Sequence, residues 1–278
     1  MDRFKVQLVA DLAIEMRVTQ ELNNLVHTLG GNRLLLRTSC MEGTHIAILQ
    51  RIEGEINKVS DHNVIWIRGS PGVGKSTLAA SISTRLQDHG RRVIPFRFDH
   101  TESTRITMEA LWRVVACDLA RWYPSLCQHL AKGIEGHISS DIDRLFKLLI
   151  ETPLSTLDPD ILYEQLSVIV VDALDECSGL KHDSSGIDNF KGLLRRLERW
   201  TLADCFRKIK LIIISQPEDR ITQTFSESIS THVVIPSGSD VKPGDSASND
   251  IKVFLTSRLS AMGMDEAWVS EAHGYMVP

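Results

Sequence analysis

Apolar residues along the chain form short runs typical of strands and longer stretches at helical spacing. Five short runs rich in Val, Ile and Phe predict buried strands, and most of them are separated by helical stretches. The predicted strands are Val64–Arg68, Val93–Phe98, Ser167–Val171, Lys210–Ser215 and Thr231–Ile235. Strands that alternate with helices favour a parallel sheet covered by helices on both faces. We therefore expect a three-layer α/β fold with a mostly parallel five-stranded sheet.

Helical spacing dominates the chain before the first strand. Apolar residues recur over Phe4–Leu29 until Gly30-Gly31 ends the run, which predicts an amphipathic helix outside the sheet domain. A second predicted helix, Ile46–Val59, leads into the first strand. We accordingly expect an N-terminal helical segment and linker over residues 1–39, and an α/β domain over residues 40–278.

The long stretch Ile106–Leu166, between the second and third strands, has helical periodicity and predicts inserted helices broken at Pro124 and Pro153. Near the other end, Ser237–Asn249 is rich in Ser, Gly, Asp and Pro and predicts an exposed loop. Helical spacing resumes over Asp250–Leu259.

Composition limits the class of protein. The 278 residues are 42% hydrophobic and 24% charged, which is ordinary for a folded globular protein. The net charge of −5 offers no basic field for nucleic acid, and no apolar run is long enough to span a membrane. The five cysteines are scattered without Cys-x-x-Cys spacing, which favours reduced thiols. We expect a cytoplasmic protein that does not bind nucleic acid.

The clearest chemical signal directly follows the first predicted strand. A Gly-x-x-x-x-Gly-Lys-Ser sequence there is followed by a predicted helix, Leu78–Leu86, and this order of strand, loop and helix predicts a P-loop. In a P-loop, backbone N–H groups and the helix N-terminus bind phosphates. We expect Lys75 to contact the β and γ phosphates and Ser76 to bind Mg²⁺. The predicted nucleotide-binding residues here are Gly69, Ser70, Pro71, Gly72, Val73, Gly74, Lys75, Ser76 and Thr77.

Acidic residues follow the third predicted strand. Asp172 ends an apolar run, and Asp175 and Glu176 come just after it. A buried strand that ends in Asp beside a P-loop typically holds the hydrated Mg²⁺, so Asp172 is the candidate metal residue. Either Asp175 or Glu176 could orient or deprotonate an attacking water, and both are candidate catalytic residues. The alternative is that these acids cap a helix or face solvent.

Polar residues also end the fourth predicted strand. Ser215 and Gln216 follow an apolar run and precede Pro217. In P-loop ATPases with an extra central strand, this position faces the γ-phosphate, so Ser215 and Gln216 are candidate nucleotide contacts. An ordinary turn in which Pro217 opens a helix would account for the same residues.

Together these motifs resemble the NACHT domain of the signal-transducing STAND P-loop ATPases, in the fungal NLR-like form with a nephrocystin-like N-terminal domain. The resemblance covers the chain from about Cys40 to its end. The matching segments are Cys40-Met41-Glu42-Gly43-Thr44, the loop Gly69–Thr77, the acidic box Asp172–Cys177, the segment Ile214–Glu218 and the helix around Asp250–Leu255.

The resemblance implies a switch driven by nucleotide exchange. ADP would hold a closed monomer, and ATP would open it for self-association and for signalling to an effector protein, in non-self recognition or cell death. The sequence departs from this family in two respects. First, the family's Ser-Arg-Pro is replaced by Ser215-Gln216-Pro217, which implies slow or absent hydrolysis. The winged-helix and repeat regions of the family are also missing, so the chain resembles a C-terminally truncated member.

The same motifs are compatible with other functions. A motor-type ATPase or a P-loop kinase would turn ATP over, and a scaffold would hold nucleotide without hydrolysing it. A kinase needs a lid with several arginines, but Arg195, Arg196 and Arg199 fall on a helical pattern that predicts a solvated face. The Asn-Lys-x-Asp sequence that specifies guanine is absent, which favours ATP over GTP without deciding between them.

Overall fold

A computed structural model gives the fold. The residues that it describes are 2–28, 38–58, 62–99, 107–130, 141–157, 167–177, 184–200, 206, 209–225, 230–237 and 240–277. Three features named from the sequence lie outside these residues: Gly30-Gly31, Cys205 and most of the expected linker between the first helix and the α/β domain.

The centre of the molecule is a five-stranded sheet, as the apolar runs predict. Its strands are β1 (Val64–Arg68), β2 (Arg92–Arg97), β3 (Ser167–Asp172), β4 (Ile209–Ser215) and β5 (Thr231–Val234). The strand order is β2-β3-β4-β1-β5, and all four pairings are parallel. The sheet was expected to be mostly parallel, and among the described strands it is entirely so.

Alternation along β1 shows that the sheet is buried on both faces. Val64 and Trp66 join one hydrophobic cluster, whereas Ile65 and Ile67 join a second cluster on the opposite face. Successive side chains of a strand point to opposite faces, so each cluster needs its own covering layer. The result is the three-layer α/β fold expected from the sequence.

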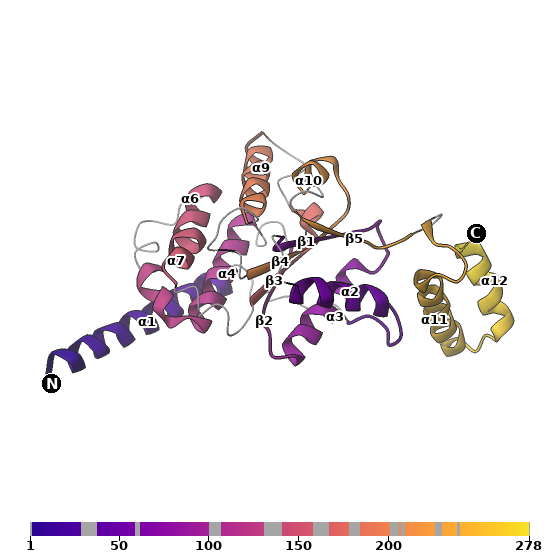
Figure 1. Ribbon diagram of the computed structural model, residues 1–278, viewed down its shortest axis with the longest axis horizontal. Coiled ribbons are helices and arrows are strands. Elements are labelled where there is room, and N and C mark those ends of the chain that lie inside the picture. Colours follow the sequence, from indigo (N-terminus) through magenta and orange to yellow (C-terminus); the bar gives the residue numbers. More distant parts are fainter. Residues whose placement is uncertain are drawn as a thin grey trace.

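Helices form the two outer layers (Figure 1). One layer contains α2 (Ile46–Asn57) and α3 (Lys75–Asp88), whose apolar residues pack on one face of the sheet. The other layer contains α4 (Met108–Trp122), α6 (Ile142–Phe146), α7 (Thr152–Ser155), α9 (Ser184–Arg199) and α10 (Asp219–Thr224). Short 3₁₀ turns lie at η2 (Pro124–Leu126) and η4 (Leu174–Glu176), and η3 (Lys147–Glu151) is a π-helical turn.

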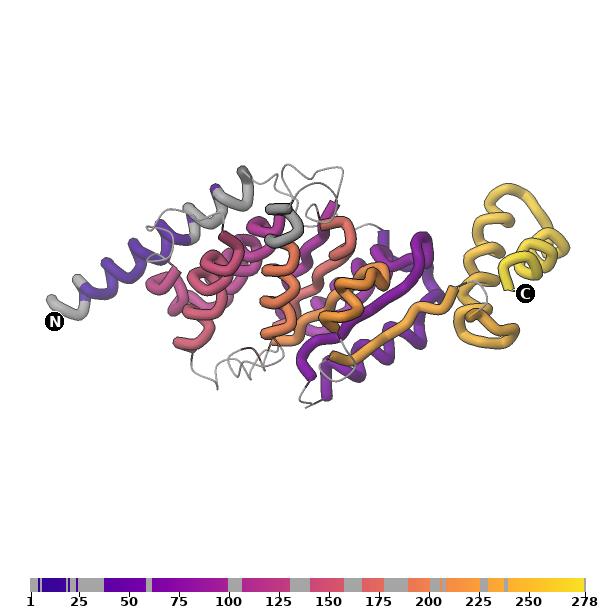
Figure 2. The backbone as a smooth tube through the Cα atoms, turned by 90° about the horizontal axis from the view of Figure 1, so that it is seen from above, coloured from indigo at the N-terminus to yellow at the C-terminus, as the bar shows by residue number. Residues whose placement is uncertain are grey.

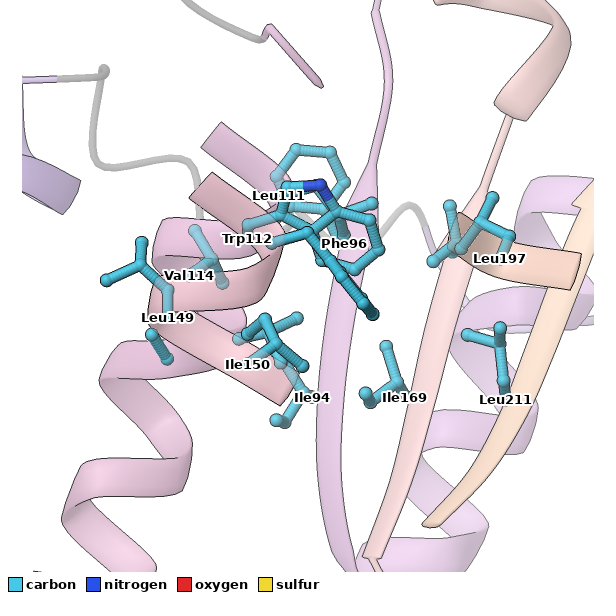
Figure 3. Packing of buried hydrophobic residues seen from close by; sticks show 14 of the residues in the cluster. Ile94, Phe96, Leu111, Trp112, Val114, Leu149, Ile150, Ile169, Leu197 and Leu211 are labelled. Carbon is cyan, nitrogen blue, oxygen red and sulfur yellow. The ribbon is translucent and has the colours of Figure 1, made fainter. Parts of the chain in front are cut away.

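The α4 layer packs on the sheet through a continuous hydrophobic cluster. Figure 3 shows Leu111 and Trp112 of α4 close to Phe96 of β2, with Ile150 of η3 beside Ile94. Trp112 also meets Phe146 edge to face, with ring centroids 4.8 Å apart. Large aromatic side chains buried in this way contribute strongly to stability, so this cluster anchors the helical layer on the sheet.

The predicted break at Pro153 is wrong. The chain stays helical through α6, η3 and α7, because the π-helical turn of η3 ends just before the proline. Pro153 lies at the start of α7, directly after the π-helical turn, where the helical hydrogen-bond pattern changes. The predicted break at Pro124 is confirmed, since α4 ends at Trp122 and Pro124 opens η2.

The two ends of the chain lie at opposite ends of the molecule (Figure 2). At one end, α1 (Asp2–Thr28) lies along α4, as an extra helix outside the sheet. The apolar face of α1 is only partly buried, because Val18 is buried while Leu8, Leu12 and Met16 remain exposed. None of the helices within the described ranges has both the length and the apolar character needed to cross a bilayer.

At the other end, α11 (Ser246–Ala261) and α12 (Glu266–Met276) pack against each other. The expected loop Ser237–Asn249 is therefore too long, because α11 already begins at Ser246. Asp245 has the extended backbone of an N-cap residue, so the polar residues that suggested a loop instead start the helix.

Candidate functional site

The glycine-rich loop, residues 69–74, joins β1 directly to α3. Gly72 and Gly74 have φ angles of 80° and 87°, a left-handed conformation that side chains disfavour. At Gly69 an added Cβ would lie 2.8 Å from Cγ2 of Val73, so a side chain would not fit. The three glycines are thus required by the turn itself, which brings the chain sharply from the end of β1 into the first turn of α3.

Lys75 begins α3 and folds back over this loop. Its Nζ donates hydrogen bonds to the carbonyl oxygens of Gly69 and Ser70, at 3.0 and 2.8 Å. Burial lowers the pKa of Lys75, and the charges of Asp175, Asp172 and Glu176 act in the opposite direction. The lysine therefore lies within electrostatic range of all three acids that follow β3.

The neighbouring hydroxyl groups have different partners. Thr77 donates from Oγ1 to the carbonyl oxygen of Gly74 at 2.7 Å, which stabilises the end of the loop. Ser70 shares a 2.9 Å hydrogen bond with Ser237, beyond β5. The Ser76 hydroxyl lies near Asp172 and acts to lower the pKa of that carboxyl. Of the three, only Ser76 is directed to an acid of β3.

Asp172 ends β3 and is almost completely buried, with 1% of its surface exposed. Its Oδ2 accepts a 3.0 Å hydrogen bond from Nη1 of Arg97, while Oδ1 is buried without a well-aligned partner among the described residues. Burial raises the pKa of Asp172, and the Arg97 charge is the largest influence that lowers it. A buried carboxylate oxygen without a partner is costly, so Oδ1 is a candidate ligand-binding atom.

The two other acids are positioned differently. Asp175 is 7% exposed, and its Oδ1 accepts a 3.0 Å hydrogen bond from the backbone N–H of Gln216. The side chain of Glu176 is 29% exposed, and its Oε1 lies 3.8 Å from Nη2 of Arg97. Asp175 therefore ties the end of β3 to the end of β4, whereas Glu176 is the acid that solvent can reach.

Replacing Asp175 with Ala should destabilise the protein, because it leaves a backbone N–H without its charged acceptor. We expect a loss of about 1–3 kcal/mol in the free energy of unfolding, measured by urea denaturation without nucleotide. Glu176→Ala is the matched control and should cost less, since its carboxylate is partly solvated. Equal losses in the two variants would show that the hydrogen bond from the Gln216 N–H to Asp175 does not stabilise the fold.

Ser215 does not point its side chain at the loop, in contrast to the sequence-based expectation. It is fully buried, and its Oγ accepts a 2.9 Å hydrogen bond from Nε1 of Trp66. Its carbonyl oxygen accepts a hydrogen bond from the N–H of Gly69 at 3.4 Å. Ser215 thus supports the loop through its backbone, while Gln216 is half-buried at the same strand end.

The sequence analysis missed Arg97, which lies at the carboxyl end of β2. Arg97 is opposite Asp172 in the β2–β3 register, so the ion pair follows directly from strand pairing. The available signal was its position near the end of a predicted strand, because carboxyl ends of parallel strands meet at one edge of the sheet.

The segment Cys40–His45 also lies against the loop. The N–H of Cys40 donates to Oγ of Ser81 at 2.8 Å, and a Cβ added to Gly74 would lie 3.2 Å from Cε1 of His45. A Cβ on Gly43 would have a contact 3.6 Å away, with Val253 of α11. The segment is therefore packed between the loop and α11.

These groups define a three-layer α/β protein with a glycine-rich loop, a lysine and three acids at the carboxyl edge of its sheet. The chain matches the nephrocystin 3, N-terminal family over residues 44–216, more than half of its length, and it belongs to that family. The match includes the loop, the acids after β3 and the end of β4.

No curated protein matches the chain. Among solved structures, it is similar to a chain of the HORMA:CdnC:Trip13 complex of E. coli MS115-1, with 11% identity and a TM-score of 0.43. That alignment covers 95% of this chain and 75% of the other.

Proposed function

We propose that this chain binds ATP or ADP with Mg²⁺ and acts as a nucleotide-dependent signalling switch that hydrolyses ATP slowly or not at all. The observation that carries the proposal is the glycine-rich loop between β1 and α3, over which Lys75 folds within electrostatic range of the three acids that follow β3. The order β3-β4-β1 supports it, since β4 separates the loop strand from the acidic strand as in P-loop ATPases with an extra central strand.

The loop residues fit a chain of phosphates. Positive φ at Gly72 and Gly74 turns the backbone at the start of α3, a helix of 14 residues whose N-terminal N–H groups favour anions. Lys75 now bonds to two loop carbonyls, which a phosphate would replace as partners. The residues proposed to hold nucleotide are Gly69, Ser70, Pro71, Gly72, Val73, Gly74, Lys75, Ser76 and Thr77, with Gln216 facing the terminal phosphate.

The residues at Asp172 fit Mg²⁺. Its Oδ1 is a buried hard oxygen without a well-aligned partner among the described residues, and the Ser76 hydroxyl lies near the same carboxyl group. No group of three or more His, Cys, Asp or Glu side chains gathers as a metal cage within the described ranges. That suits Mg²⁺, which is commonly held by one or two protein oxygens, water and substrate phosphates, and which neutralises phosphate charge when bound.

The exposed fractions of Asp175 and Glu176 support different roles for these two acids. Glu176 is the solvent-accessible acid and is the proposed residue that orients or deprotonates water. Asp175, the other candidate, has an oxygen occupied by the Gln216 N–H, which favours a supporting role. Gln216 brings no positive charge to the terminal phosphate, which supports slow hydrolysis.

The signalling role rests on the resemblance to fungal NLR-like NACHT proteins. We place the chain in the cytoplasm, where nucleotide exchange would drive self-association and contact with an effector protein. A kinase is less well supported, because two of the three candidate lid arginines are engaged in the fold. Arg196 pairs with Asp143 at 2.7 Å and Arg199 with Glu151 at 2.8 Å, so the solvated face expected for them is only partly correct.

The test is to identify the nucleotide that co-purifies with the protein and then to follow its turnover. We expect bound adenine nucleotide, a higher melting temperature with Mg-ATP, and less than one turnover during the assay. Sustained hydrolysis would favour a motor-type ATPase, and ADP release that depends on a small acceptor would favour a kinase. Absence of nucleotide together with no shift in melting temperature would refute the proposal.

A further inference from the structure

Arg97 bridges two of the acids at the candidate site. Its Nη1 lies 3.0 Å from Oδ2 of Asp172, and its Nη2 lies 3.8 Å from Oε1 of Glu176. Only 12% of the Arg97 side chain is exposed, so the guanidinium is largely shielded from solvent. A guanidinium is always charged in proteins and presents two forks of donors, which allows it to serve both carboxylates at once.

Asp172 needs this partner in the absence of metal. A carboxylate that is 1% exposed is strongly disfavoured as an anion unless an opposite charge lies next to it. Arg97 is the closest such charge that the structure shows, and it is bound to Oδ2 only. Oδ1 is buried without a hydrogen-bond partner among the described residues.

We propose that Arg97 is a positioning residue that acts as the countercharge of Asp172 and Glu176 before Mg²⁺ arrives. This inference rests on the proposed Mg-nucleotide function. Arg97 holds Oδ2 of Asp172, leaves Oδ1 without a contact to the guanidinium, and keeps Glu176 beside the same charge. A bound Mg²⁺ would also balance the negative charge of the acids. Arg97 and Mg²⁺ would therefore each stabilise these carboxylates, and one could partly replace the other.

The consequence is a specific link between Arg97 and magnesium. Without Arg97, the buried carboxylate of Asp172 loses its ion-pair partner, and the metal-free protein loses stability. Mg²⁺ restores part of that loss, because it supplies the missing positive charge at Asp172. An arginine that served only as packing would instead affect stability equally with and without metal.

The experiment measures melting temperatures of the full chain with a non-hydrolysable ATP analogue, in EDTA and in excess MgCl₂. In EDTA, Arg97→Gln should melt about 6 °C or more below wild type. The increase caused by MgCl₂ should exceed that of wild type by about 3 °C or more. Arg97→Lys, which keeps the charge, should recover most of the stability in EDTA.

The control is Arg92→Gln, at the opposite end of β2. Arg92 lies over the rings of Trp122 and Tyr123, away from the acids, and its loss should leave the magnesium-dependent increase at the wild-type value. If Arg97→Gln does not fold, the double variant Arg97→Gln/Asp172→Asn, which removes both charges, should fold in EDTA. A double variant that also fails to fold would assign Arg97 to packing and overturn the inference.

The outcomes separate the two proposals. If MgCl₂ and the analogue stabilise wild type, and Arg97→Gln gains the same number of degrees, the role of Arg97 is refuted while the nucleotide site stands. If wild type gains nothing from the analogue with or without MgCl₂, the nucleotide site is refuted and the role of Arg97 falls with it.

Discussion

Replacing Lys75 with Ala should abolish triphosphate binding while leaving the protein folded. The lysine lies half-buried at the surface of the loop and contributes charge and two hydrogen bonds to carbonyls, but no core volume. A ligand present at about 100 times its dissociation constant stabilises the native state by about 2.7 kcal/mol. Wild type should therefore melt about 5 °C or more higher with Mg-ATP, and Lys75→Ala should show no increase.

The matched control for this variant is Lys58→Ala. Lys58 is 61% exposed and pairs with Glu55 on the surface, so its removal changes the net charge equally without touching the loop. Differential scanning fluorimetry over a range of Mg-ATP concentrations gives the comparison. An increase in Lys75→Ala equal to that of Lys58→Ala would show that the bound nucleotide does not depend on the loop lysine.

Much of the sheet and the loop could be predicted from local sequence. Runs such as Val64–Ile67 are apolar at every position because both faces of a central parallel strand are buried, and few other structures produce such short, wholly apolar runs. The glycine-rich loop was equally clear, since positive φ at Gly72 and Gly74 leaves little choice of residue.

Interactions between strands were harder to predict, since they depend on register. Arg97 looks like an ordinary polar strand end until β2 is paired with β3, when it lies opposite Asp172. Ser215 looked like a nucleotide contact because it ends a strand. Its side chain instead points to the face occupied by Trp66, and only the strand order places these two residues together.

Helix geometry around prolines also could not be predicted from spacing alone. Pro153 was expected to break a helix because proline lacks an N–H, but the chain widens into a π-helical turn just before it. That solution requires packing on both sides of the turn, and Leu149 and Ile150 are buried there. Tertiary contacts therefore decide whether such a proline ends a helix or is tolerated.

Replacing Gln216 with Arg should accelerate hydrolysis of bound ATP. Gln216 follows β4, which lies between the loop strand and the acidic strand, and its N–H is held by Asp175. A guanidinium there would stabilise the charge that develops on the transferred phosphoryl group, as the Ser-Arg-Pro of the NACHT proteins that the sequence resembles is expected to do. Charged groups aimed at such a site are commonly worth ~3 kcal/mol of barrier, or on the order of 100-fold in rate.

The measurement is a quenched time course with one ATP bound per protein at saturating Mg²⁺, comparing wild type with Gln216→Arg. Gln216→Lys is the control, because it adds a charge without the planar fork and should accelerate the reaction less. Combining Gln216→Arg with Glu176→Gln should remove the gain, since the added charge cannot replace Glu176, the residue proposed to act on water. Fast ATP turnover by wild type would contradict the proposal of slow hydrolysis. An unchanged rate in Gln216→Arg would show that residue 216 does not face the terminal phosphate.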